Sequence, residues 1–176
     1  KIFTSALNVG KMLDAKVYVM HGPAQMKYTK YVTNYEFFGA RTAELYRIAK
    51  DYGITLTWEN VHWAHYNHPQ FMRNLRAYCS EPVGCTLDIK QAVQSGVTAD
   101  KYIEDMDGNI KNIHVLDMAE DGKLLLPGKG CFDFKALLER VGDYSGKVMI
   151  EVYDGSFTKP EELIESYVWL KSELGK

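Results

Sequence analysis

The sequence predicts a parallel α/β fold, and three observations support that prediction. Five short apolar runs, rich in Val, Ile, Leu and Thr, recur along the 176 residues, and each is too short for an ordinary helix. Polar or amphipathic stretches with helical spacing separate these runs. Strand and helix therefore alternate at a spacing of roughly 30 residues, which is typical of βαβ units in a parallel sheet.

The apolar runs are assigned to strands because of their length and their β-branched content. In chain order, the expected strands are Lys16–His21, Ile54–Asn60, Gly84–Asp88, Ile110–Asp117 and Lys147–Tyr153. No linker, low-complexity tract or charge block divides the chain. We therefore expect a single domain over residues 1–176.

The intervening stretches carry helix signals. The expected helices are Leu7–Ala15, Ala40–Tyr52, Pro69–Tyr78, Ile89–Ser95, Phe134–Val141 and Pro160–Leu174. The second has apolar residues near helical spacing and is followed by Gly53, a common helix stop. The last begins at Pro160 and has Glu161 and Glu162 in its first turn, where proline and acidic side chains are favoured.

The length leaves two architectures open. A closed (β/α)8 barrel needs ~250 residues, whereas this chain has 176 and shows five βα units. The sequence is either the C-terminal part of such a barrel, with its first three units absent, or an open five-stranded α/β sheet. The pattern of strands and helices alone does not separate them.

Composition narrows the class of protein. The chain is 46% hydrophobic and carries 21 basic against 23 acidic residues, which is typical of a packed domain and gives no basic surplus for nucleic acid. No apolar run approaches the ~20 residues of a membrane-spanning helix, and no signal peptide is evident, so a cytoplasmic protein is expected. Three cysteines without a CxxC pair indicate neither a disulfide framework nor a structural zinc site.

Ionisable residues stand at the carboxyl end of every predicted strand, where parallel α/β proteins place their chemistry. They are His21, Glu59, Asp88, His114 and Glu151. A single such residue is usually a helix cap or a hydrogen-bonded core side chain. Repetition at the same end of successive strands favours a shared site. Three carboxylates and an imidazole suit Mn²⁺ or Mg²⁺, with Co²⁺ or Zn²⁺ as alternatives.

The segments after the first two strands are rich in aromatic residues. Val61–Pro69 reads VHWAHYNHP and is interpreted as a substrate lid, with Trp63 or Tyr66 stacking on a sugar and His65 beside it. The alternative is a solvated loop with its aromatic side chains packed beneath. Met26–Phe38 contains five aromatic residues and is interpreted as a substrate wall, although packing against the sheet would give the same pattern.

Several segments in fixed order resemble the xylose isomerase-like TIM-barrel superfamily, which includes sugar phosphate isomerases and epimerases. The matching segments are AKVYVMHGP, AKDYGITLTWENV, VGCTLDIKQAVQSG, IKNIHVLDMAEDGKLLLPGKGCFDF, GKVMIEVYDG and PEELIESYVWLK. The most specific is IHVLD followed by DGK, PGKG and FDF. The resemblance covers Ala15 to Leu170 and implies the fourth to eighth units of a (β/α)8 barrel.

The resemblance also implies a site and a reaction. Its metal ligands would be Glu59, Asp88, His114 and Glu151. A bound divalent ion, Mn²⁺ first, would polarise a sugar carbonyl, while Glu59 and Glu151 move the proton through an enediolate. The expected substrate contacts are His21, Trp63, His65, Lys90, Asp117 and Lys123. Asn60, Lys90 and Asp117 are the nearest candidates in sequence for orienting the ligands.

Two departures from the family pattern bear on the reaction. Gln91 stands where an Asp-x-x-His motif would place histidine, and Asp121-Gly122-Lys123 replaces the Asp-x-His pair of the endonuclease branch. Both argue against a multinuclear zinc site for DNA repair. A single-metal sugar isomerase or epimerase is therefore the leading hypothesis.

Two alternatives remain. The same proton abstraction could lead to elimination, as in a lyase or dehydratase of a keto-sugar, either inosose dehydratase-like or C-glycoside-cleaving. A chain with five strands could also be an inactive remnant, or could form a homo-oligomer or take its missing strands from a partner. The expected ligand is a small sugar, with neither nucleic acid nor membrane as a partner.

Overall fold

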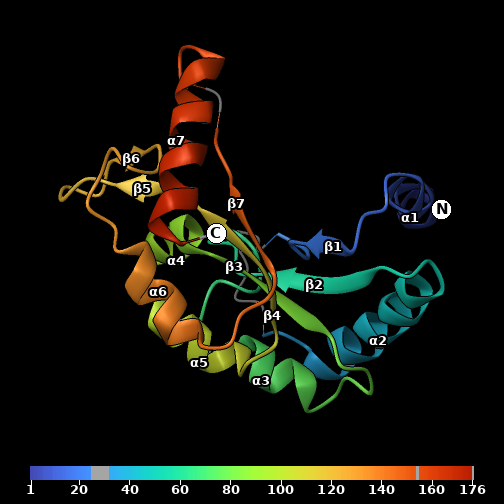
Figure 1. The fold of residues 1–176 in the computed structure, drawn as a ribbon. Helices are drawn as coiled ribbons and strands as arrows, with labels where there is room; N and C mark the ends of the chain where they lie inside the picture. The colour runs from blue at the N-terminus through green and yellow to red at the C-terminus, as the bar shows by residue number, and fades with distance from the viewer. Residues whose placement is uncertain (25–31, 154, 176) are drawn as a thin grey trace.

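Five parallel strands form one curled sheet, which Figure 1 shows as an open half-barrel. The computed structural model describes residues 1–24, 32–153 and 155–175. The strands of the sheet are β1 (Val17–Met20), β2 (Thr55–Glu59), β3 (Gly84–Asp88), β4 (Ile110–Val115) and β7 (Lys147–Ile150). Their order is β1-β2-β3-β4-β7, so neighbours in sequence are neighbours in space and the chain winds in one direction, as in part of a barrel.

One helix precedes β1, the others lie in the segments after the strands, and helices cover one side of the sheet (Figure 1). They are α1 (Ile2–Met12), α2 (Tyr35–Asp51), α3 (Phe71–Arg76), α4 (Ile89–Gln94), α5 (Ala99–Met106), α6 (Phe134–Val141) and α7 (Pro160–Glu173). A short antiparallel hairpin, β5 (Asp117–Met118) and β6 (Leu124–Leu125), follows β4. Among the described residues, no helix combines the length and apolar character needed to cross a bilayer.

The structure corrects some predicted boundaries. α2 begins at Tyr35 rather than Ala40, because the Asn34 side chain caps it by accepting the Phe37 N–H at 3.0 Å. Gly39 lies inside this helix, where an added Cβ would come within 2.5 Å of the Tyr78 carbonyl oxygen. The run Ile110–Asp117 is split between β4 and the hairpin, and α5 was not predicted.

Side-chain alternation divides each strand between a helix-facing side and an inner side. Leu56 and Trp58 of β2, and Cys85 and Leu87 of β3, belong to the core packed under the helices. The residues that alternate with them therefore lie on the inner face. At or just after the carboxyl ends of the strands, the residues that this alternation places on the inner face are His21, Glu59, Asp88, His114 and Glu151. The arrangement explains why residues up to 130 positions apart in the sequence can meet.

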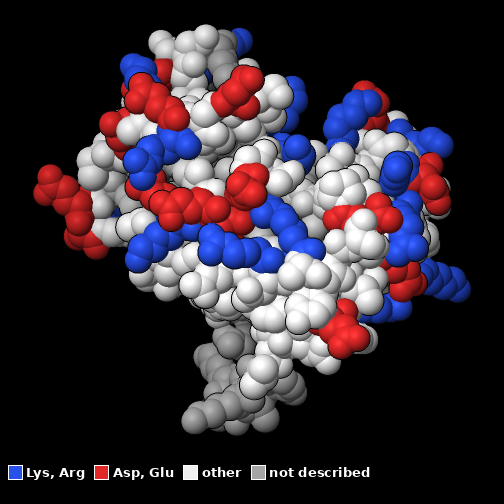
Figure 2. Space-filling model, turned by 90° about the horizontal axis from the view of Figure 1, so that it is seen from below, with Lys and Arg blue, Asp and Glu red and all other residues white. Residues whose placement is uncertain are grey.

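Aromatic side chains fill the core between the sheet and α3 and α5. Tyr66 stacks on Phe71 with ring centroids 4.8 Å apart and meets Tyr102 edge-on at 5.8 Å. All three side chains are fully buried, and the burial of Phe71, which is wholly apolar, stabilises the fold by roughly 1.5–3 kcal/mol. On the face seen in Figure 2, acidic and basic side chains lie next to one another rather than in one block of either sign.

Candidate metal centre

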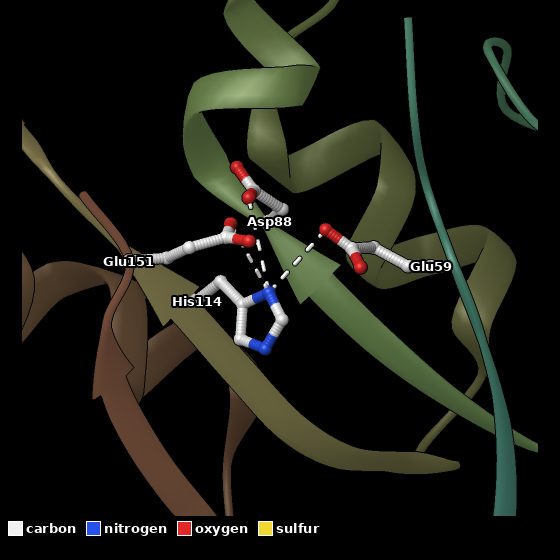
Figure 3. Close-up of side chains that lie close together, drawn as sticks. All are labelled: Glu59, Asp88, His114 and Glu151. Atoms are coloured by element: carbon white, nitrogen blue, oxygen red, sulfur yellow. Dashed lines mark hydrogen bonds and ion pairs between the residues drawn. The ribbon is translucent and has the colours of Figure 1, made fainter. Parts of the chain in front are cut away.

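Four side chains from four neighbouring strands converge on one point of the inner face (Figure 3). Glu59, Asp88, His114 and Glu151 each offer one ligand atom, and these atoms all lie within 4.8 Å of one another. His114 Nδ1 is 3.3 Å from Glu59 Oε1, 3.3 Å from Glu151 Oε2 and 3.9 Å from Asp88 Oδ2. The structure therefore brings together the four residues that the sequence grouped as metal ligands.

Asn60 holds the backbone of Asp88 through two reciprocal hydrogen bonds. Its amide nitrogen donates to the Asp88 carbonyl oxygen at 2.8 Å, and its side-chain oxygen accepts the Asp88 N–H at 2.8 Å. Asn60 follows β2, and Asp88 ends β3. The pair therefore fixes how the carboxyl ends of two strands stand relative to each other, which orients Asp88 within the cluster.

Both ring nitrogens of His114 are engaged. Nδ1 faces the carboxylates, while the side-chain nitrogen of Asn112 lies 2.9 Å from Nε2. Asn112 is two residues before His114 in β4 and therefore shares its face of the sheet. A contact to the second nitrogen of a ligand histidine fixes the orientation of the ring.

The carboxylates and the imidazole perturb one another. Hydrogen bonding to His114 holds the pKa of Glu151 well below its usual range, although burial opposes this. Burial alone would lower the pKa of His114, but hydrogen bonds to Glu151 and Glu59 outweigh it and raise that pKa to about 9. Without a metal ion, His114 is therefore positively charged at neutral pH.

Asp88 is perturbed in the opposite direction to Glu151. Burial, and a hydrogen bond shared with Glu151, raise the pKa of Asp88 to about 8. The Lys90 ammonium lies 3.5 Å from Asp88 Oδ2 and 3.1 Å from Glu151 Oε2, and its side chain is only 2% exposed. Lys90, predicted as a substrate contact, is thus enclosed between two of the candidate ligands.

The donor set fits a divalent cation. Asp88 Oδ2 is buried, with Lys90 Nζ at 3.5 Å and His114 Nδ1 at 3.9 Å. When Asp88 is ionised, this oxygen accepts no hydrogen bond from any described residue, and such an orphaned carboxylate oxygen is costly. If Asp88 and His114 release their protons, three negative carboxylates face only the single positive charge of Lys90. A hard divalent ion held by Glu59, Asp88, His114 and Glu151 would offset that excess and satisfy the orphaned oxygen.

His21 and Trp63 lie beside Glu59. His21 Nε2 is 3.1 Å from Glu59 Oε2, and its imidazole meets the Trp63 ring edge-on with centroids 5.6 Å apart. The hydrogen bond to Glu59 raises the pKa of His21, with burial acting in the opposite direction. His21 is half exposed and Trp63 is 43% exposed, so both are accessible next to the cluster.

Two other predicted substrate contacts lie elsewhere. His65, in the loop after β2, is 9% exposed, and its ring centroid lies 5.2 Å from that of Phe38. Lys123 is exposed at the turn of the β5–β6 hairpin, and no contact to the cluster is recorded for it among the described residues. Of the predicted wall Met26–Phe38, residues 26–31 lie outside the described part of the chain. Phe38 packs on Trp58.

Asp117 organises the loop that follows β4. Its Oδ1 accepts the N–H groups of Met118 at 2.8 Å and Phe132 at 3.0 Å. Its Oδ2 accepts those of Gly128 and Gly130, both at 2.9 Å. Four hydrogen bonds use the four lone-pair sites of a carboxylate. The structure thus gives Asp117 a role in shaping the loop and leaves it no acceptor for a sugar.

A Gly130→Ala variant is expected to lose roughly 1–3 kcal/mol of unfolding free energy. An added Cβ would lie 2.7 Å from Asp117 Cγ and also too close to the Met118 carbonyl oxygen. Chemical denaturation measures the loss. Gly122→Asn is the matched control, because a Cβ there meets no atom within 4 Å and Asn tolerates its φ of +82°. Equal stability of the two variants would contradict the assignment.

Several polar residues at the strand mouth were not predicted as functional. Asn112 could have been found from its position two residues before His114 on the same face. Gln91, His62 and Tyr153 form a hydrogen-bonded chain through side-chain contacts 29 and 62 residues apart in sequence. No local pattern reports such contacts.

Comparison with known proteins agrees with this geometry. The family described as xylose isomerase-like TIM barrel matches residues 1–173, whereas no curated protein sequence matches the chain. A D-tagatose 3-epimerase-like protein is similar with a TM-score of 0.77 and 23% identity, over 98% of this chain and 67% of that one. The IolI protein, solved with a zinc atom, is similar with a TM-score of 0.78 and 20% identity, over 98% of this chain and 68% of that one.

A third similar structure comes from another reaction class. The probable 3-DHS dehydratase AsbF from Bacillus anthracis gives a TM-score of 0.76 at 9% identity, over 96% of this chain and 68% of that chain. The chain thus spans about two thirds of the length of these structures, and at such identities the likeness concerns the fold. With a family match over nearly its whole length and a curled five-stranded sheet, the chain belongs to the xylose isomerase-like TIM-barrel family.

Proposed function

We propose that the chain carries the active site of a divalent-metal-dependent sugar isomerase or epimerase. The observation that carries this proposal is the convergence of Glu59, Asp88, His114 and Glu151 within 4.8 Å at the carboxyl ends of the strands. Two similar structures, a D-tagatose 3-epimerase-like protein and an L-ribulose 3-epimerase, bear names that support the reaction class.

The proposed chemistry is proton removal and return at a carbon next to a sugar carbonyl. The metal ion, with Mn²⁺ as the first candidate, would supply Lewis-acid polarisation of that carbonyl. Glu59 and Glu151 extend from β2 and from the end of β7, on opposite sides of His114 (Figure 3). One would take the proton from one face of the carbon and the other would return it to the opposite face.

His21 supports the proton-transfer role of Glu59. Its Nε2 lies 3.1 Å from Glu59 Oε2 and it is half exposed, so it offers a path for a proton between Glu59 and solvent. Trp63, edge-on to His21, would form an apolar wall for a sugar ring or carbon chain. Both glutamates contact His114, but Glu59 is also paired with His21, whereas Glu151 is also paired with Lys90. The two glutamates are therefore chemically different.

Isotope exchange tests the proposal. The protein loaded with Mn²⁺ is incubated with D-fructose and other ketohexoses in D₂O, and products are followed by mass spectrometry. A gain of one mass unit with the carbon skeleton and oxygens retained is expected. If the metal-loaded protein exchanges no carbon-bound proton of any ketohexose or ketopentose, the proposed reaction is wrong.

Elimination is a second candidate, supported by the dehydratase among the similar structures. It would begin with the same proton abstraction by Glu59 or Glu151 and end with loss of a β-substituent. The isotope experiment separates the two reactions, because elimination reduces the product mass by water or by an aglycone. A retained mass excludes elimination for the sugar tested.

We also propose that further strands close the barrel between β7 and β1. These two strands are the edges of the described sheet, and a groove of about 710 Å³ beside β7 is lined by apolar residues such as Val148, Ile150 and Leu170. Open edges of this kind invite pairing. Light scattering of the 176-residue chain should show a mass above 20.1 kDa, and a stable monomer would contradict a barrel shared between copies.

A further inference from the structure

A chain of hydrogen bonds links the loop after β2, helix α4 and the segment after β7. Gln91 lies at its centre, with His62 on one side and Tyr153 on the other. The main-chain N–H of Gln91 donates to Asp88 Oδ1 at 2.8 Å, so Gln91 is anchored to a candidate metal ligand. Its side chain points away from that ligand to two residues at the mouth of the half-barrel.

The contacts of Gln91 fix which of its amide atoms is oxygen. The His62 main-chain N–H donates to Gln91 Oε1 at 3.1 Å, and a backbone N–H can only donate, so this atom must be the acceptor. The same oxygen lies 2.6 Å from His62 Nδ1. Nδ1 must therefore carry a hydrogen, and in the neutral imidazole Nε2 is left as a hydrogen-bond acceptor.

The amide nitrogen of Gln91 determines whether the Tyr153 hydroxyl donates or accepts its next hydrogen bond. Gln91 Nε2 donates to the Tyr153 hydroxyl oxygen at 3.2 Å, which leaves the hydroxyl proton to be donated elsewhere. The Lys90 ammonium lies 4.0 Å from the centroid of the Tyr153 ring and helps to hold it in place. Among the described residues, no acceptor is recorded for the Tyr153 hydroxyl proton and no donor for His62 Nε2.

We infer that His62 and Tyr153 form a substrate-binding pair, in which His62 accepts a hydrogen bond and Tyr153 donates one. The contacts with Gln91 determine these two roles. Both side chains are accessible, since His62 is exposed and Tyr153 is 46% exposed. The pair matches a neutral polyhydroxylated compound, in which one hydroxyl donates to His62 Nε2 and another oxygen accepts from Tyr153. This inference rests on the proposed function and specifies the substrate class as an unphosphorylated sugar.

The arrangement of one acceptor on His62 and one donor on Tyr153 disfavours a phosphate at this position. A phosphate dianion offers only acceptors, so it could bind His62 Nε2 only after that nitrogen takes up a proton, whereas a sugar hydroxyl supplies its own. Sites built to hydrogen-bond one arrangement of donors and acceptors discriminate strongly against another. Gln91 is a positioning residue in this account, because it acts through His62 and Tyr153.

The tautomer of His62 can be measured without substrate, metal or turnover. Long-range ¹H–¹⁵N NMR spectra should show a protonated Nδ1 and an unprotonated Nε2 in the wild-type chain. In Gln91→Leu, the ring of His62 should shift towards a mixture of both tautomers. His68, on the same loop but without a recorded contact to Gln91, is the internal control and should not change. A His62 ring unchanged by Gln91→Leu would overturn the positioning role of Gln91.

Binding tests the pair itself. His62→Ala and Tyr153→Phe, loaded with Mn²⁺, should each bind D-fructose about tenfold more weakly by calorimetry, the loss of roughly one hydrogen bond. In turnover, KM should rise about tenfold while kcat changes little, because neither residue touches the reacting carbon. His68→Ala is the control. Unchanged affinity in both test variants would overturn the inference, even if isotope exchange supports the proposed reaction.

A comparison of ligands completes the test. Wild-type protein should bind D-fructose more tightly than D-fructose 6-phosphate, and His62→Ala should reduce that preference. Tighter binding of the phosphate by the wild type would overturn the assigned substrate class. Loss of isotope exchange with intact sugar binding would instead count against the proposed reaction alone.

Discussion

A Glu151→Gln variant is expected to bind Mn²⁺ at least about a hundredfold more weakly and to lose about a thousandfold in isotope exchange. The amide keeps the shape of the side chain but removes the negative charge that lies 3.3 Å from His114 Nδ1 and 3.1 Å from Lys90 Nζ. It also removes one of the two proposed proton carriers. Calorimetric titration with Mn²⁺ and deuterium incorporation measure the two losses separately.

The control for this variant is Glu139→Gln, which makes the same chemical change on the exposed surface of α6. It should leave both measurements unchanged. Circular dichroism of Glu151→Gln should match that of the wild type, because Lys90 and His114 retain Asp88 and Glu59 as partners. Full metal affinity in a folded Glu151→Gln variant would remove Glu151 from the ligand set.

Metal affinity should depend steeply on pH. Asp88, with a pKa raised to about 8, and His114, with a pKa raised to about 9, both hold a proton at pH 7 in the metal-free protein. Both must release it to act as ligands. The apparent affinity should therefore rise about a hundredfold per pH unit below pH 8, about tenfold per unit between pH 8 and 9, and level off above.

Calorimetry in buffers of different ionisation enthalpy counts the protons, and about two per metal ion are expected at pH 7. The raised pKa values also mean that, for these two groups, the metal-free fold is favoured at low pH and loses stability as pH rises towards their folded pKa values. The increase in Tm caused by Mn²⁺ should accordingly grow from pH 6 to pH 8. Binding without proton release would show that the four side chains do not act together as ligands.

Much of the fold was accessible from the sequence, because short apolar runs and their polar ends are local patterns. Glu59 and Asp88 end β2 and β3 as predicted, and period-two alternation places both on the inner face. The start of α2 was missed because Met26–Phe38 was interpreted as a substrate wall, so its last residues were not assigned to the helix. Gly39 lies inside α2. It is required by the close approach of the Tyr78 backbone, a tertiary contact that no sequence window contains.

The roles of individual side chains were less accessible. Asp117 and Lys90 stand next to strand ends, just as the candidate ligands do, yet one binds four backbone N–H groups and the other is enclosed by two carboxylates. Whether a polar side chain faces a loop, a neighbour or a ligand depends on distances between segments that are separated by tens of residues. Sequence spacing shows which face a residue occupies but not what it meets there.

The carboxylate of Asp117 holds together the segment between β4 and α6. The Asp117 side chain accepts hydrogen bonds from the main-chain N–H groups of Met118, Gly128, Gly130 and Phe132. The hairpin between Met118 and Gly128 is formed by β5 and β6, which pair with each other. Such a segment is a module that can be exchanged without rebuilding the sheet. Grafting hairpins of other lengths between Met118 and Gly128 is therefore a practical route to redesigning the rim of this protein while the candidate metal centre stays intact.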